Sequence, residues 1–150
     1  MAELKERLRA DLNTAMRARD QVRMRTLRMA LTSITNEEVA GSAARDLSDD
    51  EILKVLTREA RKRREAAEAF GAAGRTEQAQ AERAEGDVLA DYLPAQLSDD
   101  ELAALVDAAI AETGATGMKS MGQVMKTLTP QVAGRADGGR VAAEVRRRLS

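Results

Sequence analysis

Two pairs of neighbouring aspartates, Asp49-Asp50 and Asp99-Asp100, are the side chains whose type and spacing best fit acid-base or metal chemistry. Paired carboxylates can act as general acid and base, or hold Mg²⁺. Each pair directly follows a serine that is able to begin a helix. Acidic residues are expected in a first helical turn because they oppose the positive end of the helix dipole. Helix capping is therefore the better interpretation of both pairs.

Residue types that the commonest catalytic and metal sites require are missing from the sequence. The chain has no His and no Cys, which excludes imidazole metal ligands, thiolate zinc sites, cysteine nucleophiles and triads with a histidine base. It contains no phosphate-binding loop, dinucleotide fingerprint or Gly-x-Ser-x-Gly elbow. Ser120 follows Lys119, but adjacent residues of a helix point about 100° apart, which disfavours a Ser/Lys hydrolase. We predict no catalytic residue, no cofactor and no metal site.

Basic residues are the remaining candidates for function, and they form three clusters in a chain whose net charge is -1. One lies between Arg17 and Arg28, and one is the run Arg61-Lys-Arg-Arg64. The third is the tail, where residues 119–150 include seven Lys or Arg against two acids. Glutamates at helical spacing favour a salt-bridged surface for the second cluster, and the same interpretation is favoured less clearly for the first. For the tail, a solvated surface and a nucleic-acid contact stay open.

The tail combines cations with glycines, which suits binding to a sugar-phosphate chain. Lysine and arginine neutralise phosphates, and a glycine-flanked turn lets the backbone approach the nucleic acid closely. Aromatic residues make up only 1 % of the chain, so stacking on unpaired bases is nearly excluded, and RNA would be read by backbone and shape. The candidate RNA-binding residues are Lys119, Lys126, Gly134, Arg135, Gly138 and Arg140.

The elements that position these residues are predicted to be helices throughout. Alanine, leucine, arginine and glutamate dominate, whereas the β-branched and aromatic residues of sheet proteins are scarce, so an all-α fold is expected. Apolar residues at helical spacing predict four helices before Pro94. These helices cover about residues 4–16, in one apolar stripe of Leu4, Leu8, Leu12 and Met16, then residues 24–39, 48–70 and 75–92. We expect an N-terminal helical module at 1–94 and a three-helix tail module at 95–150.

Helix ends are marked by local signals. The sequence Leu-Ser-Asp-Asp-Glu occurs at 47–51 and again at 97–101, and both copies predict a capping box. In the tail we expect one helix closed by Gly114, a short helix around Met121 to Leu128 closed by Pro130, and a last helix from Gly138 to Leu149 capped by Asp137. The methionines at 118, 121 and 125 fit a helix core, with an adaptable partner-binding surface as the alternative.

Four sequence blocks are each weak signals, but their order and spacing are specific when they are taken together. They are Arg25-Thr-Leu-Arg28; Lys62-Arg-Arg-Glu65 with Phe70 and Ala73-Gly-Arg75; Tyr92-Leu-Pro-Ala-Gln-Leu-Ser98; and Met121-Gly-Gln-Val-Met125 with Gly134-Arg-Ala-Asp-Gly138. On these blocks the chain resembles a stand-alone member of the GatB/YqeY family over nearly all of its length. The resemblance implies two all-helical parts.

The same unit is similar to the C-terminal end of the B subunit of the glutamyl-tRNA(Gln)/aspartyl-tRNA(Asn) amidotransferase, which helps hold tRNA. Family members carry the label of carbon-nitrogen ligase with glutamine as amido-N-donor. The catalytic cradle of that enzyme lies N-terminal to the shared region and is missing here, and its amidase chemistry belongs to another subunit. This sequence also departs from the family pattern, because Gln123, Gln131, Ala133 and Gly139 stand where lysines are common.

Three hypotheses follow. The first is a non-catalytic, tRNA-associated, amidotransferase-like protein, and the second is a helical protein-protein interaction module with no RNA role. The third is an enzyme with glutamine-dependent ligase activity of its own, which predicts glutamine turnover by the purified chain, and we expect none. The expected partner of the chain is thus tRNA or a protein, and we expect it to bind neither a membrane nor a metal. A cytoplasmic location is expected, because the N-terminus shows no apolar signal core and no apolar run approaches the roughly 20 residues that span a bilayer.

Overall fold

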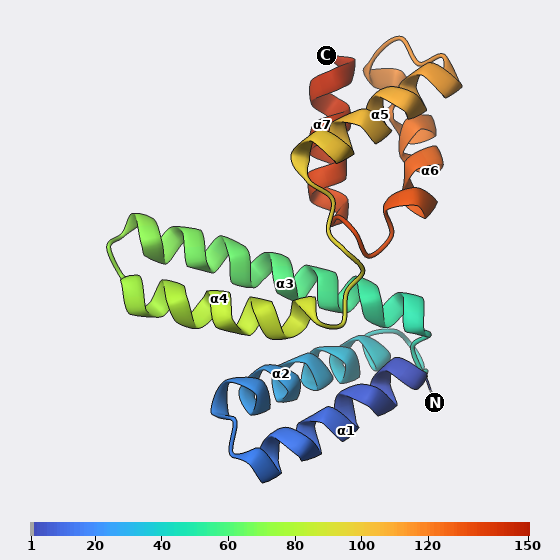
Figure 1. The fold of residues 1–150 in the computed structure, drawn as a ribbon. Coiled ribbons are helices and arrows are strands. Elements are labelled where there is room, and N and C mark those ends of the chain that lie inside the picture. The colour runs from blue at the N-terminus through green and yellow to red at the C-terminus, as the bar shows by residue number, and fades with distance from the viewer. Residues whose placement is uncertain (1) are drawn as a thin grey trace. The chain divides into compact units, whose positions relative to one another are not determined.

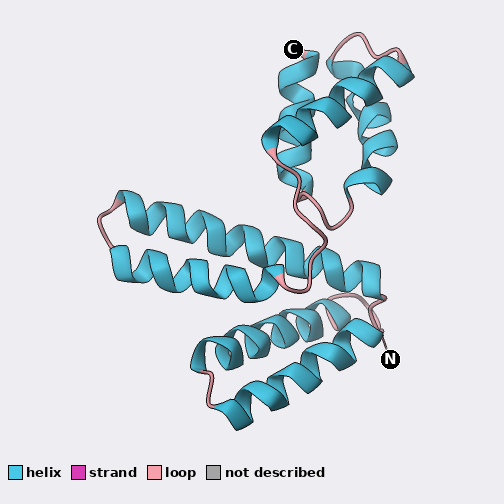
Figure 2. Ribbon diagram, viewed as in Figure 1, coloured by secondary structure: helices cyan, strands magenta, loops and turns pink. Residues whose placement is uncertain are grey.

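The computed structural model describes residues 2–150, and within them every regular element is a helix (Figures 1 and 2). The all-α prediction is confirmed. The elements are α1 (Glu3–Ala18), α2 (Gln21–Glu38), α3 (Asp49–Ala72), α4 (Thr76–Ala90), α5 (Asp99–Thr113), the short 3₁₀ helix η1 (Met118–Ser120), α6 (Met121–Val132) and α7 (Gly138–Leu149).

The chain divides into two compact units, one ending at Leu93 and the other formed by Pro94–Ser150. Each unit has its own hydrophobic core. The division into an N-terminal helical module at 1–94 and a three-helix tail module at 95–150 stays a prediction.

In the first unit, the hairpin of α1 and α2 packs against the hairpin of α3 and α4 (Figure 1). The core is aliphatic, as the near absence of aromatic residues requires. Its fully buried large side chains are Leu8, Leu27, Ile34, Ile52, Leu56 and Leu89. An ion pair is also buried there, since the Nζ of Lys5 lies 2.8 Å from Oε1 of Glu38 and 2.9 Å from its Oε2. This bond holds the pKa of Glu38 below its ordinary value.

The predicted apolar stripe of α1 is wrong at its last position. Met16 is 45 % exposed, whereas its neighbour Ala15 is buried. The reason is geometric: four residues turn a helix by about 400°, so a strict four-residue repeat drifts about 40° at each step. Two steps after Leu8, the fully buried residue of the stripe, position 16 has turned about 80° from the direction of the core.

Both predicted capping boxes are confirmed. The hydroxyl of Ser48 accepts from the backbone N–H of Glu51, and Ser98 does the same for Glu101, while each glutamate accepts from the serine's own N–H. The paired aspartates lie in the first turns of α3 and α5, as helix capping predicts. The left-handed Gly114 closes α5, with φ of 67°.

The second unit packs α5, α6 and α7 around a core of its own (Figure 1). Met121 and Met125 are partly buried against it, which fits the core interpretation, but Met118 is 46 % exposed. The prediction that Pro130 closes α6 is wrong, because the helix continues to Val132. Although Pro130 forfeits one backbone hydrogen bond, Val132 is only 5 % exposed, and its burial stabilises the last turn.

Candidate nucleic-acid interface

The turn between α6 and α7 is hydrogen-bonded to the segment that precedes α5. The backbone N–H of Leu97 donates to the carbonyl of Arg135 at 2.9 Å. The side-chain amide of Gln96 donates to the carbonyl of Gly134 at 2.8 Å. Gly134 is buried and has a φ of 75°, a conformation that other residues adopt only with strain. A glycine at this position therefore allows the backbone conformation of the turn, and the buried residue offers no open surface to a nucleic-acid strand.

Arg140 joins the same two segments through its guanidinium. Its Nη1 donates to the carbonyl of Leu97 and its Nη2 to Oδ1 of Asp99, both at 2.8 Å. Its backbone N–H donates to Oδ1 of Asp137, which caps α7 as predicted. Gly138 begins α7 beside this cap, where an added Cβ would meet nothing within 4 Å, so close packing does not require glycine there. Arg140 is thus largely committed to the fold.

Arg135 uses only part of its hydrogen-bonding capacity within the protein. Its Nε donates to the carbonyl of Ala95 at 3.3 Å, whereas its two terminal nitrogens have no partner within residues 2–150. Its positive charge adds to the hydrogen bonds from Ser98 in lowering the pKa of Glu101. The side chain is half-buried and oriented, with its outer edge available to an anion.

Lys119 and Lys126 lie on the solvent side of η1 and α6. Because successive α-helical residues turn by about 100°, exposed positions three, four and seven apart in α6 share one face, and Lys119 precedes that face in η1. We call this face the α6 stripe, and its exposed members are Lys119, Gly122, Gln123, Lys126, Thr129, Pro130 and Ala133. The opposite face carries the buried Val124, Leu128 and Val132.

The α6 stripe lies in a stretch without acidic residues, because none occurs from Thr113 to Ala136. The exposed acids of this unit lie on α5 instead, and two of them, Asp99 and Asp107, pair with arginines of α7. Arg148 contacts Asp107 at 2.9 Å, and both Arg147 and Arg148 bind Glu144 and lower its pKa. In contrast, neither Lys119 nor Lys126 has an ion pair or side-chain hydrogen bond within the described part of the chain.

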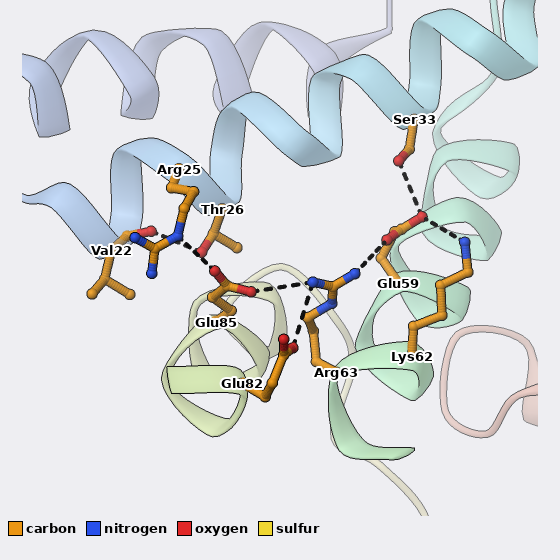
Figure 3. A network of polar contacts seen from close by, with 9 residues as sticks. All are labelled: Val22, Arg25, Thr26, Ser33, Glu59, Lys62, Arg63, Glu82 and Glu85. Carbon is orange, nitrogen blue, oxygen red and sulfur yellow. Dashed lines mark hydrogen bonds and ion pairs between the residues drawn. The ribbon is translucent and has the colours of Figure 1, made fainter. Parts of the chain in front are cut away.

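Three basic residues of the first unit, Arg25, Lys62 and Arg63, pair with the buried glutamates Glu59 and Glu85 in one network (Figure 3). Arg63 of α3 pairs with Glu59, Glu82 and Glu85 at 3.2 to 3.7 Å. Glu85 also binds Nε of Arg25 from α2 at 2.7 Å, and Glu59 accepts from Lys62 and Ser33. A salt-bridged surface is therefore the right interpretation for most of the second cluster. Within the first cluster, Arg25 is paired in this way, whereas Arg28 is exposed and has no partner within residues 2–150.

Tyr92, which opens another of the four sequence blocks, is also a structural residue. The residue is 5 % exposed, its hydroxyl donates to Oδ2 of Asp11 at 2.5 Å, and the guanidinium of Arg7 lies 4.6 Å from the ring centre. Burial raises the pKa of this hydroxyl. The ring is thus closed to any stacking base.

The six candidate residues therefore separate into two groups. Gly134, Arg135, Gly138 and Arg140 come together at the turn and the start of α7, while Lys119 and Lys126 lie on the α6 stripe. Sequence reasoning missed Gln123, which is exposed between the two lysines. The signal was present in its offsets from them, four residues after Lys119 and three before Lys126.

No group of three or more acidic side chains able to hold a metal ion occurs among residues 2–150. In the same range, no helix combines the length and the hydropathy that crossing a membrane would need.

Comparison with known families gives one result for this chain. A family described as Yqey-like protein matches residues 5–149, which is nearly the whole sequence. Among curated proteins, none matches the chain significantly.

Proposed function

Because the chain belongs to the YqeY-like family, we propose that it is a non-catalytic helical protein that binds the sugar-phosphate backbone of tRNA. The observation that carries the proposal is the α6 stripe, an exposed helix face with two unpaired lysines and no acidic residue. A cation that is already paired with an acid inside the protein gains little binding free energy from a phosphate. Lys119 and Lys126 have no such pair and are free to replace counterions on RNA.

The choice of tRNA comes from the resemblance of the four sequence blocks to the tail of the amidotransferase B subunit, which helps hold tRNA. In this proposal Lys119 and Lys126 make the principal phosphate contacts. Arg135 adds one through its unpartnered terminal nitrogens. Arg140 acts indirectly by holding the turn in place, and Gly134 supplies the left-handed backbone conformation of that turn.

A mobility-shift titration of total tRNA at low and high salt tests the proposal. We expect retardation at low salt that weakens as salt rises. Each phosphate contact contributes about 0.7 to 0.9 to the slope of log affinity against log salt. The double variant Lys119→Ala/Lys126→Ala should therefore lower that slope by about 1.5 and weaken binding.

The matched control is Lys54→Ala/Arg146→Ala. It also removes two exposed cations that have no partner within residues 2–150, but from α3 and α7. If the control weakens binding as much as the α6 variant, net charge and not the stripe governs the interaction, and the proposed site is wrong. Absence of retardation at low salt would reject the tRNA function itself.

Catalysis has a separate test, because the family label is carbon-nitrogen ligase with glutamine as amido-N-donor. We propose that the chain has no such activity of its own, which is consistent with a sequence lacking His and Cys. Incubation of the purified chain with glutamine and ATP should release no ammonia above a blank. Turnover that scales with protein concentration would contradict this part of the proposal.

The alternative function, a protein-protein interaction module, is favoured by one observation. Met118 is 46 % exposed at the start of the α6 stripe, and methionine suits adaptable contacts. Met121 and Met125 are less suited to this role because they pack against the core of the second unit. The alternative replaces the RNA proposal if the chain does not bind tRNA but binds a purified protein partner. Met118→Ser should then abolish binding of that partner, whereas Met16→Ser should not.

A further inference from the structure

Gln123 occupies the centre of the cationic face. Within α6, Gln123 and Lys126 are three residues apart, which corresponds to about 60° of rotation and about 4.5 Å along the helix axis. Lys119 lies in the 3₁₀ helix η1 that leads into α6, four residues before Gln123. Along the chain, a neutral amide thus lies between two exposed ammonium groups.

The side-chain amide of Gln123 is available for a ligand. It is exposed and makes no hydrogen bond within residues 2–150, although its main-chain carbonyl accepts from the hydroxyl of Thr127. A carboxamide both donates and accepts hydrogen bonds. A ribose 2′-hydroxyl has the same double capacity, and it is the group that distinguishes RNA from DNA. In a nucleic-acid strand, each ribose lies between two phosphates, just as this amide lies between two lysines.

The remainder of the α6 stripe is short and without rings. Gly122, Thr129, Pro130 and Ala133 project little, and an added Cβ at Gly122 would meet nothing within 4 Å. Such a face cannot stack unpaired bases. It matches the wide, shallow minor groove of A-form RNA, which displays 2′-hydroxyls, whereas the minor groove of B-DNA is only about 6 Å wide.

We propose that the α6 stripe selects double-helical RNA over DNA and over unpaired RNA, with Gln123 hydrogen-bonding a ribose 2′-hydroxyl while Lys119 and Lys126 contact the flanking phosphates. This inference rests on the proposed RNA function and specifies the class of nucleic acid. It assigns charge neutralisation to the lysines and discrimination between the sugars to the glutamine.

The test uses the full chain and four oligonucleotides of one sequence: an RNA hairpin, the same hairpin with 2′-fluoro riboses, the DNA hairpin, and an unpaired RNA strand. The 2′-fluoro hairpin keeps A-form geometry but cannot donate a hydrogen bond from the 2′ position. The wild-type chain should bind the RNA hairpin about fivefold more tightly than its 2′-fluoro form, the expected effect of one hydrogen bond. The DNA hairpin and the unpaired strand should bind more weakly than the RNA hairpin.

Gln123→Ala and the 2′-fluoro hairpin together give a double-mutant cycle between the glutamine side chain and the ribose 2′-hydroxyl. The substitution should weaken binding to the RNA hairpin about fivefold, leave binding to the 2′-fluoro hairpin unchanged, and keep the salt slope of the wild type. Gln123→Lys should bind all four oligonucleotides more tightly, steepen the salt slope, and reduce the preference for RNA. Far-ultraviolet circular dichroism checks that these changes at an exposed position leave the helices intact.

The inference is overturned if the wild-type chain binds the RNA and 2′-fluoro hairpins equally, or if Gln123→Ala weakens RNA and DNA by the same factor. In both cases the proposed function still stands, provided that Lys119→Ala/Lys126→Ala weakens RNA binding. If none of the four oligonucleotides binds at low salt, the inference and the proposed function fail together.

Discussion

Removing the Arg140 side chain should loosen the second unit, because its guanidinium holds the segment before α5 against the start of α7. The bond from its Nη1 to the Leu97 carbonyl is charge-assisted, and such bonds contribute about 1.5–3 kcal/mol. Its ion pair with Asp99 adds little, since the Asp99 side chain is 98 % exposed and surface pairs contribute about 0.2–1 kcal/mol. Because Arg140 itself is 25 % exposed, we expect Arg140→Ala to destabilise this region by about 2 kcal/mol.

Amide hydrogen exchange of the full chain measures this effect locally. The reporter is the N–H of Leu97, which donates to the carbonyl of Arg135 at 2.9 Å. A loss of about 2 kcal/mol corresponds to exchange about 30-fold faster. The control is Asp99→Asn, which removes the exposed partner but keeps the bond to Leu97. It should change exchange by no more than about fivefold.

The opposite result would refute this reasoning. If Arg140→Ala leaves the exchange of Leu97 unchanged but abolishes retardation of tRNA, then Arg140 is a direct ligand of RNA and its internal bonds contribute little. If Asp99→Asn accelerates exchange as much as Arg140→Ala, the exposed ion pair and not the carbonyl bond holds the segment.

Three further predictions concern stability. Lys5→Met leaves the buried Glu38 carboxylate without its partner and should lower the free energy of unfolding by about 3 kcal/mol. Adding Glu38→Met should restore most of this loss. Urea denaturation measures both variants, and a loss below about 1 kcal/mol for Lys5→Met would contradict a buried ion pair. The hydrogen bonds from Arg45 and Ser48 lower the pKa of Glu51 to about 2 from 4.5, so its contribution is fully present above pH 4.5 and lost as pH falls toward 2. Melting temperatures of wild type and Glu51→Gln should therefore converge over that range, and a constant difference would reject the assignment. Gly134→Ala, at a φ of 75°, should destabilise by about 1 kcal/mol, whereas Gly138→Ala in open space should be neutral or stabilising; equal effects in thermal unfolding would show that backbone strain is not the cause.

Local signals made the helix ends predictable. The capping boxes and the left-handed Gly114 act within a few residues, so their neighbours in sequence are also their partners in space. Predictions failed where burial decided the outcome. Met16 fits a four-residue repeat but has turned away from the core, and Pro130 lies inside α6 because the burial of Val132 stabilises one more turn.

The contacts that the candidate residues make inside the protein were not predictable from the sequence. Gly134 and Arg140 resemble a phosphate-binding turn in sequence, yet their contacts fix that turn to the segment around Leu97. Gln123 drew attention only as a position without a lysine. Its place between two unpaired cations became apparent once the exposed face of α6 was defined.

The sequence by itself determined the all-α class, most helix ends and the absence of histidine and cysteine chemistry, because composition and signals within one helical turn suffice for these. Only the tertiary structure decided which cations remain available. Arg63 meets Glu85 across 22 positions and Arg140 meets the Leu97 carbonyl across 43, distances that no local pattern encodes. Lys119 and Lys126 have no such partner, because their stretch of the sequence has no acid and the packing of α5 and α7 brings none within ion-pair distance.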